Sequence, residues 1–214
     1  MNTSPALSQG SASIRRDLAA LAARYHGLGW MMGTSGNLSS RCSPDRVVVT
    51  ASGCDKGTLT EHDFVEVNLD GEVLAAGAGR RPSAETSIHL AIYRQCGGAN
   101  AALHVHTPDS SLITQGSTNP SFLDYTGFEM VKGWGLWEPG AVAKLPLFDN
   151  HADVPRIASD VERWLEEARS VPALLIERHG ITAWGEDLKD AHRHLEVTEF
   201  LCRVARSSGE SSAT

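Results

Sequence analysis

Residues 101–108 read AALHVHTP, a run that predicts a buried β-strand leading directly into a helix. Apolar residues dominate the first six positions, and a run of this length suits a strand covered on both faces. Thr107 is a good N-cap and Pro108 is favoured at the first position of a helix, so we expect the chain to restart there as a helix. A strand followed at once by a helix indicates mixed α and β structure.

Helical and β-like patterns alternate on both sides of this strand. Apolar residues spaced three and four apart follow the N-cap candidates Ser13, Ser83 and Asp187, and a similar pattern follows Asp153. The predicted helices cover residues 14–28, 83–96, 153–168 and 188 onward. The predicted strands cover residues 46–50, 64–68, 101–106, 171–177 and 181–184, and the runs between residues 30 and 74 indicate antiparallel sheet. Residues 119–144 are expected to be irregular, with one short helix.

The composition fits a single domain. The chain has 214 residues and a mass of 23.0 kDa, which is enough to bury most of its apolar surface. Its 41% hydrophobic and 21% charged residues are ordinary for a globular protein, and no linker or internal repeat divides it. We expect one domain at residues 14–206, a flexible N-terminal tail at 1–13 and a flexible C-terminal tail at 207–214.

Charge and hydropathy argue against two classes of partner. The 19 Lys and Arg residues and 26 Asp and Glu residues give a formal net charge of −7, and no basic cluster is longer than Arg80-Arg81, so no nucleic acid is expected to bind. No apolar run approaches the roughly 18 residues that span a bilayer, so no membrane partner is expected. The N-terminus lacks the features of a secretory signal, and the four cysteines show no pairing pattern. These features favour reduced thiols and a cytoplasmic location.

A metal site is the sharpest chemical prediction. His104 and His106 are two apart in a predicted strand, so both imidazoles point to the same face and can reach one metal ion. His179 lies where a predicted strand breaks at a glycine, which makes it the best candidate for a third ligand. The alternative is that these are scattered histidines without a metal. By contrast, His192 and His194 in the last helix point about 200° apart, and we assign them to a solvated face.

Three short segments offer hydroxyl groups and backbone N–H groups that could together bind a phosphate. We name them loop 1 (residues 33–37, GTSGN), loop 2 (50–53, TASG) and loop 3 (82–85, PSAE). Taken singly, each reads as an ordinary turn. Their candidate phosphate-binding residues are Ser35, Gly36, Asn37, Ser52, Gly53 and Ser83.

Two carboxylates are candidates for proton transfer. Glu85 ends loop 3, and Glu129 stands in an otherwise apolar segment bounded by glycines, where a raised pKa would suit acid and base work. The alternative for Glu129 is an ion pair with Lys132 on a helix surface.

These motifs, with His104-Val105-His106 and Arg178-His179-Gly180, occur in the order and at the approximate spacings of the class II aldolase and adducin family, which the chain resembles from about residue 18 to 204. Within that family, four segments are similar to a dehydratase branch. They are residues 51–57, 127–133, 149–153 and 179–185.

The resemblance implies an α/β class, a three-layer α/β/α fold around a mainly antiparallel central sheet, and a homotetramer with active sites near subunit contacts. It also implies one Zn²⁺ per subunit, held by His104, His106 and His179. Glu85 would serve as acid or base beside the metal or as a transient fourth ligand, and Glu129 would be the catalytic carboxylate of the dehydratase branch. Which of the two is the main proton carrier stays open.

The reaction implied by the dehydratase branch is zinc-dependent dehydration of 5-methylthioribulose 1-phosphate to 2,3-diketo-5-methylthiopentyl 1-phosphate, a step of methionine salvage. Trp134 or Trp137 would line an apolar slot for the methylthio group. One alternative is an aldolase or 4-epimerase acting on fuculose, rhamnulose or ribulose phosphate. Aldolases of the family commonly use a tyrosine near the C-terminus, whereas the last tyrosine here is Tyr125, which favours dehydration. Another alternative is an adducin-like interaction domain, which is expected to lack the metal ligands.

Overall fold

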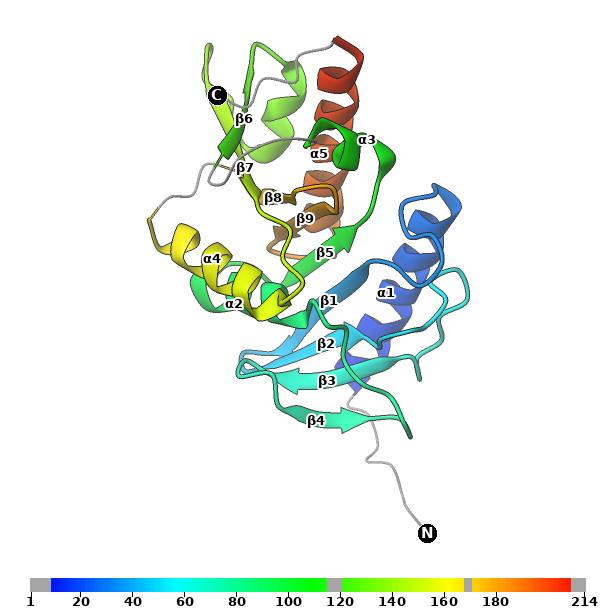
Figure 1. Ribbon diagram of the computed structural model, residues 1–214. Coiled ribbons are helices and arrows are strands. Elements are labelled where there is room, and N and C mark those ends of the chain that lie inside the picture. The colour runs from blue at the N-terminus through cyan, green and yellow to red at the C-terminus, as the bar shows by residue number, and fades with distance from the viewer. Residues whose placement is uncertain (1–8, 115–120, 168–170, 209–214) are drawn as a thin grey trace.

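The computed structural model describes residues 9–114, 121–167 and 171–208, which form one mixed β-sheet with helices on both faces (Figure 1). The sheet has nine strands in the order β4-β3-β2-β1-β5-β9-β8-β7-β6. The strands are β1 (Asn37–Ser43), β2 (Arg46–Thr50), β3 (Phe64–Asn68), β4 (Val73–Ala76), β5 (Ala101–Val105), β6 (Ser121–Thr126), β7 (Val142–Phe148), β8 (Ala173–Ile176) and β9 (Gly180–Gly185). The helices are α1 (Gln9–Gly27), α2 (Thr86–Gln95), α3 (Pro108–Ile113), α4 (Val154–Glu167), α5 (Leu188–Ser208) and the 3-10 helix η1 (Glu129–Trp134).

The helices form a layer on each face of the sheet. All neighbouring strands are antiparallel except β7 and β8, which are parallel. In β2, Val48 belongs to the core cluster that includes residues of α1 and α5, whereas Val47 and Val49 belong to the cluster that includes residues of α2 and α4. The two clusters lie on opposite faces of the sheet, because successive side chains of a strand alternate. The expected three-layer α/β/α fold around a mainly antiparallel sheet is confirmed. No helix within the described ranges is long and apolar enough to cross a membrane.

Local signals located several elements correctly. The strands predicted at 46–50 and 64–68 are β2 and β3. Thr107 caps α3, where its Oγ1 accepts the Ser110 N–H at 3.0 Å. Asp187 precedes α5, and its Oδ1 accepts the Asp190 N–H at 2.8 Å. These capping predictions succeed because each depends only on residues within one turn of the cap.

The start of α1 differs from the prediction. The helix begins at Gln9, so Ser13 is inside it and residues 9–13 do not belong to a tail. No proline interrupts these residues, and Ser11 is only 1% exposed, which packs this turn against the protein. At the other end, α5 continues to Ser208, two residues into the expected C-terminal tail. Residues 1–8 and 209–214 lie outside the described ranges, so the flexibility expected of the tails is not tested.

Two further predictions need correction. α2 begins at Thr86 rather than after Ser83, because residues 83–85 form a turn in which the Ser83 carbonyl accepts the Thr86 N–H at 3.1 Å. Residues 119–144 contain two strands, since β6 pairs along its whole length with β7. The chain between these strands contains η1 and is too long for a hairpin turn, so no local signal announces the pairing.

The close approach of β5 and β9 requires a glycine at position 180. A Cβ there would lie 2.1 Å from the Val105 carbonyl oxygen and 3.1 Å from the ring of His106. Only a residue without a side chain lets β9 begin against the end of β5. The same contact sets the position of His179, the residue before it.

A buried carboxylate joins α5 to the start of α3. Glu199 is 2% exposed, and its Oε2 accepts the Thr107 hydroxyl at 2.5 Å. Burial raises the pKa of Glu199 from 4.5 to about 7; Asp109 adds to the rise, while Thr107 and Arg203 oppose it. The folded state therefore favours the protonated acid. Its contribution to stability is complete below the unfolded pKa near 4.5 and is lost as the pH rises through about 7.

Gly180→Ala is expected to lower the free energy of unfolding by at least about 2 kcal/mol, because the backbones of β5 and β9 must separate to admit a methyl group. Denaturant titration measures this. Gly98→Ala is the matched control, since nothing lies within 4 Å of a Cβ at that position. Equal losses in the two variants would contradict the close approach.

Glu199→Gln removes the titration and keeps a neutral hydrogen-bonding group of the same shape. Relative to the wild type, the variant is expected to gain up to about 2 kcal/mol of stability between pH 5 and pH 8, because only the wild type must ionise a buried acid. Unfolding experiments at both pH values measure the difference. A stability difference that does not change with pH would show that Glu199 ionises freely in the folded protein.

Candidate metal centre

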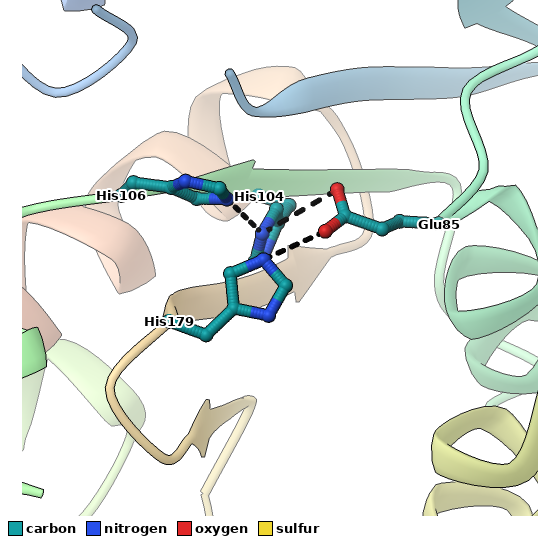
Figure 2. Close-up of side chains that lie close together, drawn as sticks. All are labelled: Glu85, His104, His106 and His179. Atoms are coloured by element: carbon teal, nitrogen blue, oxygen red, sulfur yellow. Dashed lines mark hydrogen bonds and ion pairs between the residues drawn. The ribbon is translucent and has the colours of Figure 1, made fainter. Parts of the chain in front are cut away.

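Four side chains converge at the C-terminal end of β5 (Figure 2). Each of Glu85, His104, His106 and His179 offers one ligand atom, and these atoms all lie within 4.8 Å of one another. They come from three places in the chain: the residue before α2, the end of β5 and the turn between β8 and β9. The three histidines predicted as ligands, and Glu85, are therefore brought together by the fold.

His104 in β5 and His106, directly after the strand, face each other as the strand periodicity predicts. His104 and His106 are two residues apart, and their Nε2 atoms lie 2.9 Å from each other. Figure 2 shows His179 and Glu85 pointing toward the same place from other segments. The alternative of scattered histidines does not describe this arrangement.

Strand register supports the first of these ligands. β5 lies between β1 and β9, so that His104 pairs with Asn37 on one side and Thr182 on the other. The Oγ1 atom of Thr182 lies 2.9 Å from His104 Nδ1. A His that donates Nδ1–H to this hydroxyl keeps its lone pair on Nε2, the atom that faces the cluster.

Glu85 is held in place by hydrogen bonds to both of its oxygens. Asn37 Nδ2 donates to Oε2, and His179 Nε2 lies 2.7 Å from Oε1. Burial opposes ionisation of Glu85, but the neighbouring His104 and the hydrogen bond from His179 outweigh it and hold the pKa well below its usual range. The carboxylate is ionised at neutral pH.

The imidazoles of His104 and His106 are uncharged at neutral pH. Burial lowers the pKa of His104 to about 4, against the influence of Glu85. Burial also lowers the pKa of His106 to about 3, and His104 and His179 lower it further. Neutral imidazoles carry the lone pairs that metal coordination requires.

This donor set fits a divalent metal ion. Neutral imidazole nitrogens that face one another are mutually unfavourable acceptors unless a proton or a cation lies between them. Imidazole nitrogens with a carboxylate oxygen are ligands that suit zinc and other transition metals. Three nitrogen ligands leave room for a further ligand, as in catalytic sites.

The three candidate phosphate loops lie around the cluster. The Ser52 N–H donates to the Arg81 carbonyl at 2.8 Å, which joins loop 2 to the start of loop 3. The Leu38 N–H donates to Thr50 Oγ1 at 3.2 Å, which joins the end of loop 1 to loop 2. Gly36 has a φ of +73°, and a Cβ there would lie 2.8 Å from the His104 carbonyl oxygen, so loop 1 packs on β5 only with glycine at this position.

The six candidate phosphate-binding residues differ in exposure. Ser52 and Gly53 are exposed, Ser35 and Ser83 are half-buried, and Gly36 and Asn37 are buried. The amide of Asn37 is occupied by Glu85, so its side chain supports the metal cluster. Ser83 accepts the Glu85 N–H at 3.4 Å and does not cap α2.

Glu129 lies outside the cluster of its own chain. It begins η1, its side chain is 83% exposed, and Lys132 Nζ lies 2.7 Å from its Oε1. The surface ion pair considered as an alternative is therefore present. The apolar surroundings expected from the flanking sequence do not form, because η1 turns Glu129 away from the buried Val131 and Trp134.

The surroundings of three further side chains differ from those predicted. These are Trp134, His192 and His194. Trp134 is buried, and its Nε1 donates to the His194 carbonyl at 3.4 Å. It borders a pocket whose lining includes Pro172 and Trp184 but none of the four residues of the metal cluster. His194 is itself buried, with Nδ1 2.6 Å from the Trp184 carbonyl oxygen. His192 lies 2.7 Å from the Tyr25 hydroxyl. The solvated face predicted for these two histidines is wrong, since α1, β9 and η1 pack around them.

No pattern in the sequence indicates Thr182 or the supporting role of Asn37. Both act through positions opposite His104 in neighbouring strands. Only knowledge of the strand register identifies them, because neither is close to His104 in the sequence.

Residues 16–206 match the family model described as Class II Aldolase and Adducin N-terminal domain. The chain belongs to the class II aldolase and adducin family.

Similar proteins cover almost the whole chain. Methylthioribulose-1-phosphate dehydratase from Microcystis aeruginosa is 42% identical over 191 residues, which are 88% of this chain and 93% of that protein. The protein of the same name from Leptospira biflexa is 40% identical over 197 residues, which are 88% of this chain and 94% of that one. The crystal structure of YgbL from Escherichia coli has a TM-score of 0.79 at 25% identity and covers 95% of this chain and 93% of its own.

Thr182→Val is expected to weaken metal binding by about tenfold or more, because the shape is kept and the hydrogen bond that orients His104 is lost. Titration with Zn²⁺ as the probe against a chelating indicator measures the affinity. Thr198→Val is a matched control on α5, since Thr198 is also buried but bonds to the His194 carbonyl. Unchanged affinity in Thr182→Val would mean that this hydroxyl does not support the ligand.

Proposed function

We propose that this member of the class II aldolase and adducin family dehydrates 5-methylthioribulose 1-phosphate to 2,3-diketo-5-methylthiopentyl 1-phosphate, a hydro-lyase step of methionine salvage. The observation that carries the proposal is 42% and 40% identity, over most of the chain, to relatives named methylthioribulose-1-phosphate dehydratase. The convergence of three histidines and Glu85 supports it, because the reaction needs a site that stabilises developing negative charge.

The metal in this proposal is one Zn²⁺ per subunit. His104, His106 and His179 would hold it, with Glu85 beside them as a transient fourth ligand. When bound, zinc supplies Lewis acidity that stabilises negative charge on the C2 and C3 oxygens of the substrate. The proposed working form is a homotetramer in the cytoplasm.

Glu85 is better suited to bind the metal than to transfer a proton. Its Oε2 accepts a hydrogen bond from the Asn37 amide, and its pKa is held well below the usual range. A carboxylate with a very low pKa is a weak base near neutral pH. We therefore assign the main proton transfer to Glu129.

Glu129 would act in the active site of a neighbouring subunit. It is exposed and separate from the cluster of its own chain. Trp137, which is 69% exposed, lies on the same surface, since Lys132 Nζ is 5.8 Å from its ring centroid and pairs with Glu129. A second copy that docks there would receive Glu129 as a base and Trp137 as part of an apolar slot for the methylthio group.

The proposed proton path needs only one carboxyl group. Glu129 takes the proton from C3 and then returns it to the C4 hydroxyl, which leaves as water. The C3–H and C4–O bonds break, a C3–C4 double bond forms, and the resulting enol becomes the 2,3-diketone. The C1 phosphate would rest on the three loops, at Ser35, Gly36, Asn37, Ser52, Gly53 and Ser83, and binding there would keep C3 within reach of the base.

The side chains argue against the aldolase alternative. Retro-aldol cleavage needs an acid at the C4 oxygen, the task of a tyrosine in related aldolases. All three tyrosines of this chain are buried, with Tyr25 at 0%, Tyr93 at 1% and Tyr125 at 3% exposure. None of them can act as the acid at the C4 oxygen, either in the site of its own subunit or in that of a neighbouring subunit.

A product assay tests the proposed reaction. Zinc-loaded protein is incubated with 5-methylthioribulose 1-phosphate, and in parallel with fuculose 1-phosphate and ribulose 5-phosphate, and the products are resolved by mass. Loss of one water molecule from the first substrate alone is expected. Cleavage to a triose phosphate and an aldehyde, or formation of an isobaric epimer, would instead establish the aldolase or epimerase alternative.

Glu129→Gln is expected to keep its zinc and lose at least about 100-fold in kcat, because the amide cannot accept the C3 proton. Glu186→Gln, an exposed site at the end of β9, is the matched control and should retain activity. Near-normal turnover in Glu129→Gln would show that the base has been assigned wrongly.

Mixed oligomers test the subunit that supplies the base. Glu129→Gln and His179→Ala are each expected to be inactive, but dissociation and reassembly of an equal mixture should restore about a quarter of the wild-type activity if each site combines residues of two subunits. No recovery in mixed oligomers would place Glu129 and the metal ligands in one subunit.

A further inference from the structure

Lys56 is a buried cation that neither the metal site nor the proton path uses. It is 1% exposed, although lysine is seldom buried without a charged partner. In the described parts of the chain, no carboxylate oxygen lies within 4.0 Å of the Lys56 ammonium. Its position follows directly after loop 2 in the sequence, three residues beyond Gly53.

The Lys56 ammonium joins the two loops that contain most of the candidate phosphate ligands. Its Nζ donates to the Thr34 carbonyl of loop 1 at 2.9 Å and to the carbonyl of Cys54, the residue after loop 2, at 3.0 Å. An ammonium has three hydrogens, so these two bonds leave one donor. The side chain thus fixes the spacing of the loops and brings a positive charge to them.

The charge of Lys56 also reaches the reacting centre. Burial lowers the pKa of Lys56, while Cys54, Glu85 and Asp55 act to raise it. Lys56 in turn contributes to the lowered pKa of His106. The group therefore lies within electrostatic range of the cluster, on the side where loops 1 and 2 meet it.

We propose that Lys56 is the positioning cation of the substrate's phosphate subsite, where it holds loops 1 and 2 at the spacing of a phosphate and supplies the charge that a phosphate dianion offsets. A buried cation without a carboxylate partner is costly, and a doubly charged anion bound to the adjoining loops compensates it. The exposed Ser52 and Gly53 and the half-buried Ser35 give such an anion access. This inference rests on the proposed function for the identity of the substrate.

The test measures binding of inorganic phosphate, which requires no turnover. Wild-type protein is expected to be stabilised against thermal unfolding by phosphate, and calorimetric titration gives the Kd. Lys56→Met should weaken phosphate binding by about tenfold or more while the zinc content stays at the wild-type level. Lys189→Met is the matched control, because it removes the same charge from an exposed position on α5.

Two conservative variants separate charge from structure. Lys56→Arg and Lys56→Gln both keep N–H donors for the Thr34 and Cys54 carbonyls, but only Arg keeps the charge. We expect the Arg variant to bind phosphate more tightly than the Gln variant. With the phosphorylated substrate, Lys56→Gln should raise KM more than it lowers kcat, since the lost interaction is present in the ground state and the transition state alike.

The outcomes are distinguishable from those of the proposed function. The protein could bind phosphate in a way that depends on Lys56 and yet fail to dehydrate the sugar phosphate. That result would support the phosphate subsite and contradict the proposed reaction. Wild-type phosphate affinity in Lys56→Met, equal affinity in the Arg and Gln variants, or loss of zinc in parallel with phosphate would overturn the inference. So would failure of all three variants to fold, because the role of Lys56 would then be structural.

Discussion

The register of β5 with its two neighbouring strands is the constraint on which the rest of the site depends. His104 lies opposite Asn37 of β1 and Thr182 of β9, so one side of the ligand is supported by a hydroxyl and the other by the amide that holds Glu85. A shift of one residue would turn both partners to the other face of the sheet. Gly180 fixes this register at the end of the strand, because its lack of a side chain allows β9 to begin against the Val105 carbonyl.

Burial then determines the protonation states at the site. The imidazoles of His104 and His106 are kept neutral by burial, and Glu85 is kept ionised by the histidines around it. The site therefore presents the lone pairs of neutral imidazole nitrogens and the negative charge of Glu85. Together they attract a divalent cation. The same low-dielectric environment makes the unpaired charge of Lys56 unfavourable. A bound phosphate would offset this charge. Opposite charges are placed on the two sides of one site, where a phosphorylated sugar could bridge them.

Sequence patterns predicted those features that depend on neighbouring residues. His104 and His106 follow from the two-residue period of a strand, and Thr107 and Asp187 follow from capping chemistry within one helical turn. The strand break at Gly180 made His179 the candidate for a third ligand, and the family resemblance supplied the three-layer fold. By contrast, Thr182 acts through a strand distant in the sequence, and β6 pairs with β7 across a long connection, so neither had a local signal. The environment of Glu129 also depends on more than its flanking residues, since η1 leaves its carboxylate exposed.

Zinc-edge X-ray absorption of the purified protein, combined with metal analysis, tests the central claim most directly. The arrangement of Glu85 and the three histidines predicts one zinc per chain with nitrogen and oxygen ligands only, and zinc–nitrogen distances of about 2.0 to 2.1 Å. The His179→Ala variant should lose this signal. A sulfur ligand at about 2.3 Å, or zinc retained in full by the variant, would contradict the assignment of the site.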